Sequence, residues 1–135
     1  MAAKSEYLPD TNTVLRYLLN DHPDLSQRAR VFWEAVRLGE QRAILTEGVL
    51  MECVYVLQRF YKVPRDEIAS HLKGILSYKG LDAANKSLFD QTLTVYQTKN
   101  LDFVDCILAV RHARGEGILF SFDDNLNKLV SADKA

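Results

Sequence analysis

A chain of 135 residues, of which 47% are hydrophobic and 26% charged, has the size and composition of one globular domain. Its apolar stretches are interrupted by acids well before the roughly 20 residues that a membrane-spanning helix requires, and its first residues lack the apolar core of a signal peptide. The formal net charge of -1 gives no overall field that would attract nucleic acid. We therefore expect a single, soluble, cytoplasmic domain over residues 1–135, without membrane association, that recognises its ligands locally.

Short apolar runs alternate with longer amphipathic runs along the chain, which predicts an α/β fold. Strands are expected at about residues 6–9, 42–45 and 118–122. Helices are expected at about residues 13–19, 25–38, 47–60, 64–76, 86–97, 101–115 and 124–130. Thr46 is predicted to cap the third of these helices, and Gly39 to end the second. Strands separated by helices predict a three-layer α/β/α fold, with a short central parallel sheet covered by helices.

Four acidic residues interrupt or end runs that otherwise have the composition of a hydrophobic core: Asp10, Glu52, Asp105 and Asp123. Asp10 and Asp123 each follow a predicted strand, and parallel sheets bind ligands at the carboxyl ends of their strands. Glu52 and Asp105 lie on predicted helices that could cover the same edge. A carboxylate in apolar surroundings costs several kcal/mol unless it is paired, protonated or bound to a metal. Four such acids in one small domain suggest a shared cation.

Carboxylate ligands without His or Cys favour Mg²⁺ or Mn²⁺ over zinc. Such ions bind phosphate oxygens and activate water, so phosphodiester hydrolysis is the expected reaction class. Serine-hydrolase, dinucleotide-binding and P-loop motifs are absent from the sequence. Cys53 and Cys106 are expected to be buried hydrophobic residues, and no catalytic role is expected for His22, His71 or His112.

Each acid also has a purely structural interpretation. The alternatives are a helix cap for Asp10, an ion pair to Arg16 or Arg42 for Glu52, simple solvent exposure for Asp105 and a turn for Asp123. The neighbouring acids Glu47, Asp102 and Asp124 are expected to cap helices or to support the ligands. Arg16 is interpreted as a surface arginine in preference to a contact with RNA phosphate.

Four segments, taken in their order and approximate spacing, resemble the PIN-domain family. They are residues 10–19, 50–57, 101–109 and 120–123. Within that family they are most similar to the VapC-type ribonuclease toxins of bacterial toxin-antitoxin modules. The similarity extends over nearly the whole chain.

This resemblance implies a metal-dependent endoribonuclease whose catalytic and metal-binding acids are Asp10, Glu52, Asp105 and Asp123, with Mg²⁺, or alternatively Mn²⁺, as cofactor. Asn12 and Ser121 match polar positions that in the family orient carboxylates or water. The implied partners are an RNA substrate, a cognate antitoxin whose C-terminal tail covers the acidic cleft, and a second copy of the chain in a homodimer. Metal-activated water would leave 5′-phosphate and 3′-hydroxyl ends.

The sequence departs from the family pattern at two places. Asn125 and Leu126 stand where many relatives have an acid and an aromatic residue, so either Asp123 or Asp124 could be the fourth acid. Pro9 replaces the usual β-branched residue and cannot donate a ladder hydrogen bond, which places it at the end of the first strand.

Two other functions are compatible with the same residues. A catalytically idle PIN-like domain would act as a protein- or RNA-binding module. A phosphatase-like Mg²⁺ enzyme is less favoured, because Asp10-Thr11-Asn12 lacks the second aspartate of the DxD motif. The apolar residues considered for a dimer or antitoxin contact are Phe32, Trp33, Tyr55 and Tyr61, although most of them are expected to pack in the core.

Overall fold

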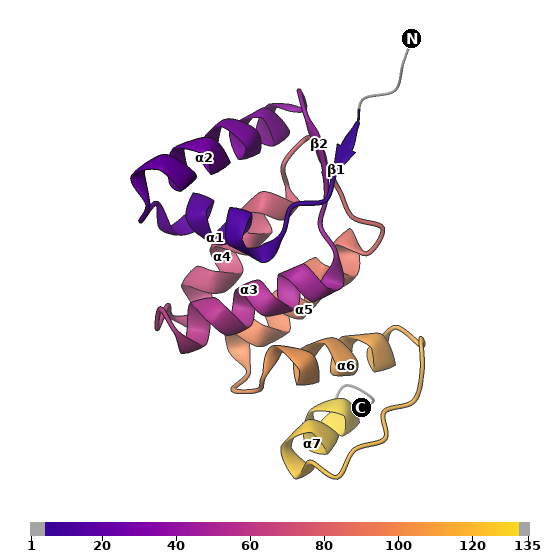
Figure 1. The fold of residues 1–135 in the computed structure, drawn as a ribbon. Helices are drawn as coiled ribbons and strands as arrows, with labels where there is room; N and C mark the ends of the chain where they lie inside the picture. Colours follow the sequence, from indigo (N-terminus) through magenta and orange to yellow (C-terminus); the bar gives the residue numbers. More distant parts are fainter. Residues whose placement is uncertain (1–4, 133–135) are drawn as a thin grey trace.

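The computed structural model describes residues 5–132, and within them the chain is a helix-rich α/β domain (Figure 1). The strands are β1 (Glu6–Tyr7), β2 (Arg42–Ile44) and β3 (Leu81–Asp82). The helices are α1 (Thr11–Leu19), α2 (Pro23–Leu38), α3 (Glu47–Arg59), α4 (Arg65–Leu76), α5 (Lys86–Thr98), α6 (Phe103–Ala113) and α7 (Asp124–Ala132). Among the described residues, no helix is long and apolar enough to cross a membrane.

The three strands form one parallel sheet in the order β1-β2-β3. Tyr7 is in register with Ala43, and Ala43 with Leu81. The approach of β3 to the end of α2 requires a glycine at position 80. A Cβ atom there would lie 2.0 Å from the carbonyl oxygen of Gln41 and 2.8 Å from that of Val36. A parallel sheet of sequential strands is the arrangement that the alternating pattern predicts.

Local sequence explains where the helices begin and end. The hydroxyl of Thr46 accepts a hydrogen bond from the Val49 amide at 3.4 Å and caps α3, as predicted. Gly39 ends α2 in the left-handed region, with a φ of 82°, which also confirms the prediction for that residue. His22 caps α2 through Nδ1, which accepts a hydrogen bond from the Leu25 amide at 3.0 Å. This histidine therefore has a structural role.

The predicted strand at residues 118–122 is wrong: this segment joins α6 to α7 and pairs with no strand among the described residues. Its polar backbone groups find side-chain partners instead. The Leu119 amide donates to Nδ1 of His112 at 2.9 Å, and the Ser121 carbonyl accepts from Nδ2 of Asn127 at 2.9 Å. The Leu119 side chain packs on the α6–α7 contact. These interactions hold the segment along its own helical hairpin and away from the sheet.

One large hydrophobic cluster forms the core, and Trp33, Tyr96 and Phe89 are its largest fully buried side chains. Cys53 and Cys106 belong to this cluster and are free thiols, as predicted. Three residues form a second, smaller cluster that attaches α7 to α6: Ala109, Leu126 and Val130. Figure 1 shows this hairpin at the end of the molecule opposite to β1 and β2.

Candidate active site

Asp10 lies just after β1, where the chain enters α1. Its Oδ1 accepts a hydrogen bond from the Thr13 amide at 3.1 Å, and the Thr13 hydroxyl donates to the Asp10 carbonyl oxygen at 2.8 Å. Asp10 is thus the N-cap of α1, while its side chain remains exposed. Asp10 therefore has the helix-capping role that was one of its two interpretations. The cap leaves other lone pairs of the carboxylate available, since one oxygen can accept more than one hydrogen bond.

Glu52 lies on the exposed side of α3, between buried residues of that helix. Neither arginine considered as its partner pairs with it: Arg16 pairs with Asp21 at 2.7 Å, and Arg42 with Asp82 at 3.3 Å. Within residues 5–132, Glu52 makes no ion pair. Its carboxylate is therefore available to another ligand.

The thiol of Cys53 indicates that Asp10 and Glu52 belong to one electrostatic neighbourhood. Burial, followed by the negative charges of Glu52 and then Asp10, raises the pKa of Cys53 to about 12. Because the charge of Asp10 acts on a residue of α3, the loop after β1 lies close to this helix. We define Asp10 and Glu52 as the first acidic pair.

Asp105 lies in the first turn of α6 and is half-buried. Burial, followed by the charges of Asp102 and Asp123, raises the pKa of Asp105 above its ordinary range. We define Asp105 and Asp123 as the second acidic pair. A cation placed here would offset both the burial and the repulsion that raise this pKa.

Asp123 caps α7: its Oδ1 accepts a hydrogen bond from the Leu126 amide at 2.8 Å. The hydroxyl of Ser121 accepts from the Asp123 amide at 3.0 Å, so Ser121 fixes the backbone of the acid that follows it. Asp124 is the first residue of α7. The expectation that Asp123 follows a strand is wrong, because it follows the irregular segment 118–122.

No group of three or more Asp, Glu, His or Cys side chains within residues 5–132 comes close enough to hold one metal ion. The electrostatic effects of the four candidate acids group them in two sets: the charges of Asp10 and Glu52 both act on Cys53, and the charge of Asp123 acts on Asp105. The oxygen donors fit a hard divalent cation in their chemistry. The geometry of the four acids in this structure is more open than that of one shared site.

The neighbouring acid Glu47 has an ion-pair role. Nη2 of Arg111 on α6 donates to Oε1 of Glu47 at 2.6 Å, and Nη1 of the same arginine donates to Glu116 at 2.7 Å. This arginine connects the start of α3 to the end of α6. The helices that carry Glu52 and Asp105 are thus held together by charge as well as by the core.

A groove of about 300 Å³ lies between α3 and the start of α6 beside the second acidic pair. Asp102, Asp105, Arg59 and Tyr55 are among the residues that line it. The Arg59 guanidinium lies 5.7 Å from the centre of the Tyr55 ring. The groove therefore combines apolar surface with charges of both signs.

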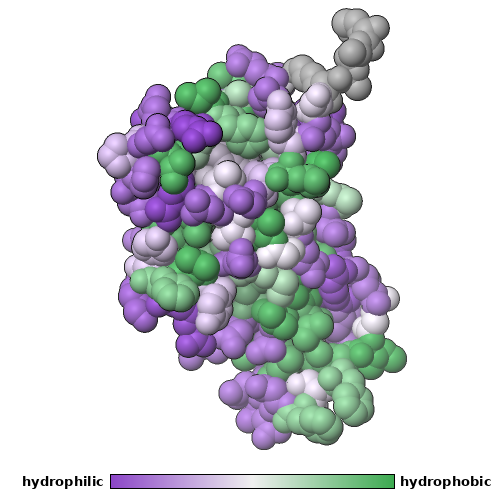
Figure 2. All heavy atoms as spheres, viewed as in Figure 1, coloured by the Kyte–Doolittle hydropathy of each residue, from purple (hydrophilic) through white to green (hydrophobic). Residues whose placement is uncertain are grey.

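The most exposed of the large apolar side chains within residues 5–132 lie on segment 118–122. Ile118, Phe120 and Phe122 are 89%, 85% and 92% exposed, and the rings of Phe120 and Phe122 contact each other edge to face at 5.5 Å. Figure 2 shows hydrophobic surface gathered in this region, at the lower right of the molecule. We call these three residues the apolar segment face. Trp33, in contrast, is fully buried, so it cannot form the intermolecular contact considered for it.

Sequence reasoning missed a second cavity, which adjoins Asp10. Arg28 and Phe32 of α2 line it together with residues around Asp10. Their spacing of four residues places them on one face of the helix. This spacing is the sequence signal from which a shared surface of Arg28 and Phe32 could have been predicted. Arg16, interpreted as a surface residue, is instead largely covered and donates to Asp21 at 2.7 Å and to the Tyr61 hydroxyl at 3.0 Å.

The comparisons with known proteins agree with the fold. The PIN domain model matches residues 7–131, and the chain therefore belongs to the PIN-domain family. It is similar to a VapC ribonuclease from Aquifex aeolicus (strain VF5), with 27% identity over 124 residues that cover 90% of each chain. No solved structure matches the chain.

Proposed function

We propose that this protein is a Mg²⁺- or Mn²⁺-dependent endoribonuclease and the toxin of a toxin-antitoxin system. The observation that carries the proposal is the PIN-domain match across residues 7–131, which includes all four candidate acids. Similarity over 90% of both chains to a protein described as a VapC ribonuclease supports the same substrate and role. We place the protein in the cytoplasm, where RNA is the substrate.

Asp10, Glu52, Asp105 and Asp123 are the residues proposed to bind the ion. When bound, a divalent ion supplies positive charge for the phosphate and lowers the pKa of a coordinated water. The chain contributes the positions of the carboxylates. The cap to Thr13 holds Asp10, and the bond between the Asp123 amide and Ser121 holds Asp123.

Asn12 is proposed to orient water or RNA beside Asp10. Its side chain is exposed at the second position of α1 and lines the cavity that adjoins Asp10. The amide has both a donor and an acceptor, which suits it to either role.

The test is cleavage of a total RNA pool by the purified full chain, with Mg²⁺ present or with the metal removed by a chelator. The proposal expects cleavage with Mg²⁺, its loss on chelation and its loss in Asp10→Asn and Asp105→Asn. Glu40→Gln is the matched control, because Glu40 is an exposed acid outside the proposed site. Metal-independent cleavage, or equal cleavage by all variants, would overturn the proposal.

The second candidate function is a catalytically idle binding module. The finding that no three acidic side chains within residues 5–132 come close enough to hold one ion favours it. This alternative expects RNA or protein association without cleavage, and no change of melting temperature when Mg²⁺ is added. Cleavage that depends on Asp10 would exclude it.

A cognate antitoxin is the protein partner that this assignment implies. Its proposed binding surface is the groove between α3 and α6, where exposed Tyr55 and Val104 adjoin Asp105. Co-expression of the antitoxin should relieve growth arrest caused by the toxin. Val104→Glu in this groove should weaken that protection, and unchanged protection would place the partner elsewhere.

A homodimer is also proposed, with the apolar segment face as the contact. Apolar surface of this kind is costly in water and commonly marks an interaction site. Light scattering should give twice the chain mass for the wild type and a smaller mass for Phe120→Ser. A monomeric wild type would contradict this part of the proposal.

A further inference from the structure

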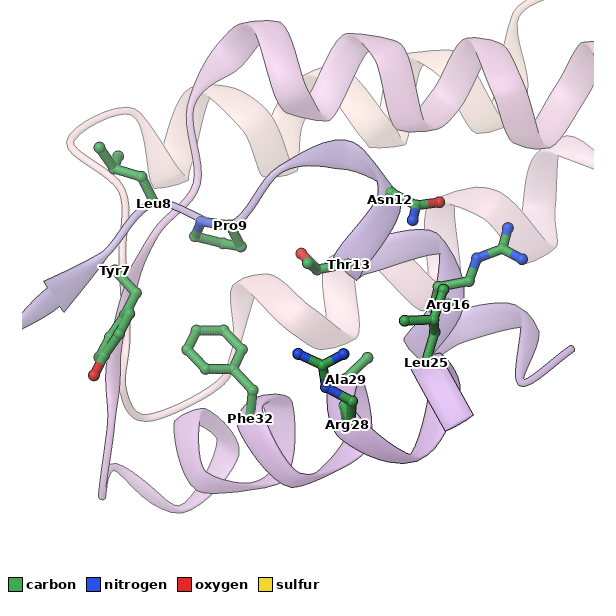
Figure 3. A pocket seen from close by; sticks show the side chains of 10 residues that line it. All are labelled: Tyr7, Leu8, Pro9, Asn12, Thr13, Arg16, Leu25, Arg28, Ala29 and Phe32. Atoms are coloured by element: carbon green, nitrogen blue, oxygen red, sulfur yellow. The ribbon is translucent and has the colours of Figure 1, made fainter. Parts of the chain in front are cut away.

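A cavity of about 380 Å³ lies directly beside Asp10, between the β1–α1 connection and α2 (Figure 3). Six of its lining residues carry the inference: Tyr7, Pro9, Asn12, Arg16, Arg28 and Phe32. The cavity adjoins the first acidic pair because its lining contains the residues on either side of Asp10. It is large enough to receive a single planar ring with its substituents.

Aromatic side chains form one wall of the cavity. The ring of Phe32 contacts Tyr7 edge to face at 5.5 Å and Trp33 at 5.2 Å. Trp33 is fully buried, so Phe32 is held against a fixed part of the core. A rigid aromatic ring in a cavity is a stacking surface for a nucleobase.

Positive charge lies beside this aromatic wall of the cavity. Arg28 is exposed, and no carboxylate within residues 5–132 pairs with it. Arg16 is anchored by Asp21 and Tyr61, and its buried Nε has no hydrogen-bond partner among the described residues. In Figure 3 the guanidinium group of Arg28 lies beside the ring of Phe32, whereas that of Arg16 is directed away from it. The lining residues include no carboxylate, so the cavity favours an anionic ligand.

We propose that this cavity binds one unpaired nucleotide of the RNA, next to the phosphodiester that is cleaved. The base stacks on Phe32, Arg28 contacts its phosphate, and the exposed amide of Asn12 can read the base edge. Because a base within a duplex cannot enter such a cavity, the substrate is single-stranded at this position. The inference rests on the proposed ribonuclease function and deepens it.

An apolar protein segment is the other occupant that the cavity could take. The unpaired guanidinium of Arg28 and the exposed amide of Asn12, with no lining carboxylate, are more than such a segment requires. They match the phosphate and the base edge of a nucleotide. The observations therefore favour RNA.

The experiment measures binding of a labelled single-stranded RNA, and of the same sequence as a duplex, to the full chain carrying Asp10→Asn, with the metal chelated. This background keeps the RNA intact. Phe32→Leu preserves an apolar side chain and removes the stacking surface, and its affinity should fall by roughly tenfold. Phe60→Leu is its matched control, since Phe60 is an exposed aromatic residue away from the cavity.

Arg28→Gln should weaken binding and lower the slope of log affinity against log salt by about one, because one phosphate contact is lost. Arg30→Gln removes the same charge from the same helix outside the cavity and should leave the slope unchanged. Should Phe32→Leu fail to fold, Tyr7→Leu tests the same wall with a more exposed residue.

The proposal is overturned when the cavity variants bind single-stranded RNA as their controls do, or when the duplex binds equally well. It is also overturned when these variants lose only their inhibition by the antitoxin, which would assign the cavity to a protein segment. Neither result bears on the ribonuclease function, which the separate cleavage assay decides.

Discussion

Oδ1 of Asp10 accepts a hydrogen bond from the backbone N–H of Thr13 at 3.1 Å, so an acid proposed to bind metal also caps α1. The structural and the catalytic interpretations of this residue are therefore compatible. The cap fixes the direction of the carboxylate and satisfies a backbone donor at the start of the helix.

Two substitutions at Asp10 should separate its roles. Asp10→Ala removes the cap and should lower the free energy of unfolding by about 1 kcal/mol, whereas Asp10→Asn keeps a capping side chain and should stay within a few tenths of a kcal/mol of the wild type. Urea unfolding of the three proteins measures this difference. Equal destabilisation by both substitutions would show that the cap contributes little beyond the charge.

Gly80 should tolerate no side chain. A Cβ atom there would overlap the carbonyl oxygen of Gln41, so Gly80→Ala must displace backbone between α2 and β3. We expect a loss of about 3 kcal/mol in the free energy of unfolding.

Gly74 provides the matched control, because it lies inside α4 and an added Cβ atom there would meet no neighbouring group within 4 Å. Gly74→Ala should stabilise the protein by about 0.5 to 1 kcal/mol through its higher helix propensity. The two variants should thus differ in sign in the same denaturation assay. A mild effect at position 80 would contradict the close approach of the two backbones.

Asp105 should make the stability depend on pH in an unusual direction. Burial and the charges of Asp102 and Asp123 raise its pKa, so the folded chain binds this proton more tightly than the unfolded chain. Its contribution to stability is therefore greatest in acid and is lost as the pH rises through the raised pKa.

Asp105→Asn should remove this dependence and be at least as stable as the wild type at neutral pH. Thermal melts from acid to neutral pH, with Glu40→Gln as an exposed control, measure the effect. Added Mg²⁺ should raise the melting temperature of the wild type more than that of Asp105→Asn, because the ion compensates the charge. Clear destabilisation of Asp105→Asn at neutral pH would contradict the repulsion inferred for this acid.

The helices were predictable because their apolar residues recur at helical spacing. The observed helix boundaries differ from the predicted ones where a capping side chain sets the first residue of the helix. Helix α1 begins at Thr11, two residues before the predicted start, because Asp10 is its N-cap. β3 was missed because two residues carry no alternating pattern. The short apolar run over residues 118–122 predicts a strand, yet Leu119 packs on the α6–α7 hairpin.

The position of Asp10 directly after the first strand was predictable from the sequence. The geometry of the candidate site was not predictable, because the placement of Asp123 depends on segment 118–122. The position of Arg28 in the cavity beside Asp10 was also hidden, since only tertiary packing brings α2 to the loop that contains Asp10.

The most direct test of the central claim is the chemistry of the RNA ends produced by the wild type and by Asp10→Asn, mapped with Mg²⁺ present and after chelation. A water nucleophile activated at the acidic site should leave 5′-phosphate and 3′-hydroxyl ends, only in the wild type and only with the metal. Cyclic phosphate ends, or the same ends in Asp10→Asn, would contradict the account.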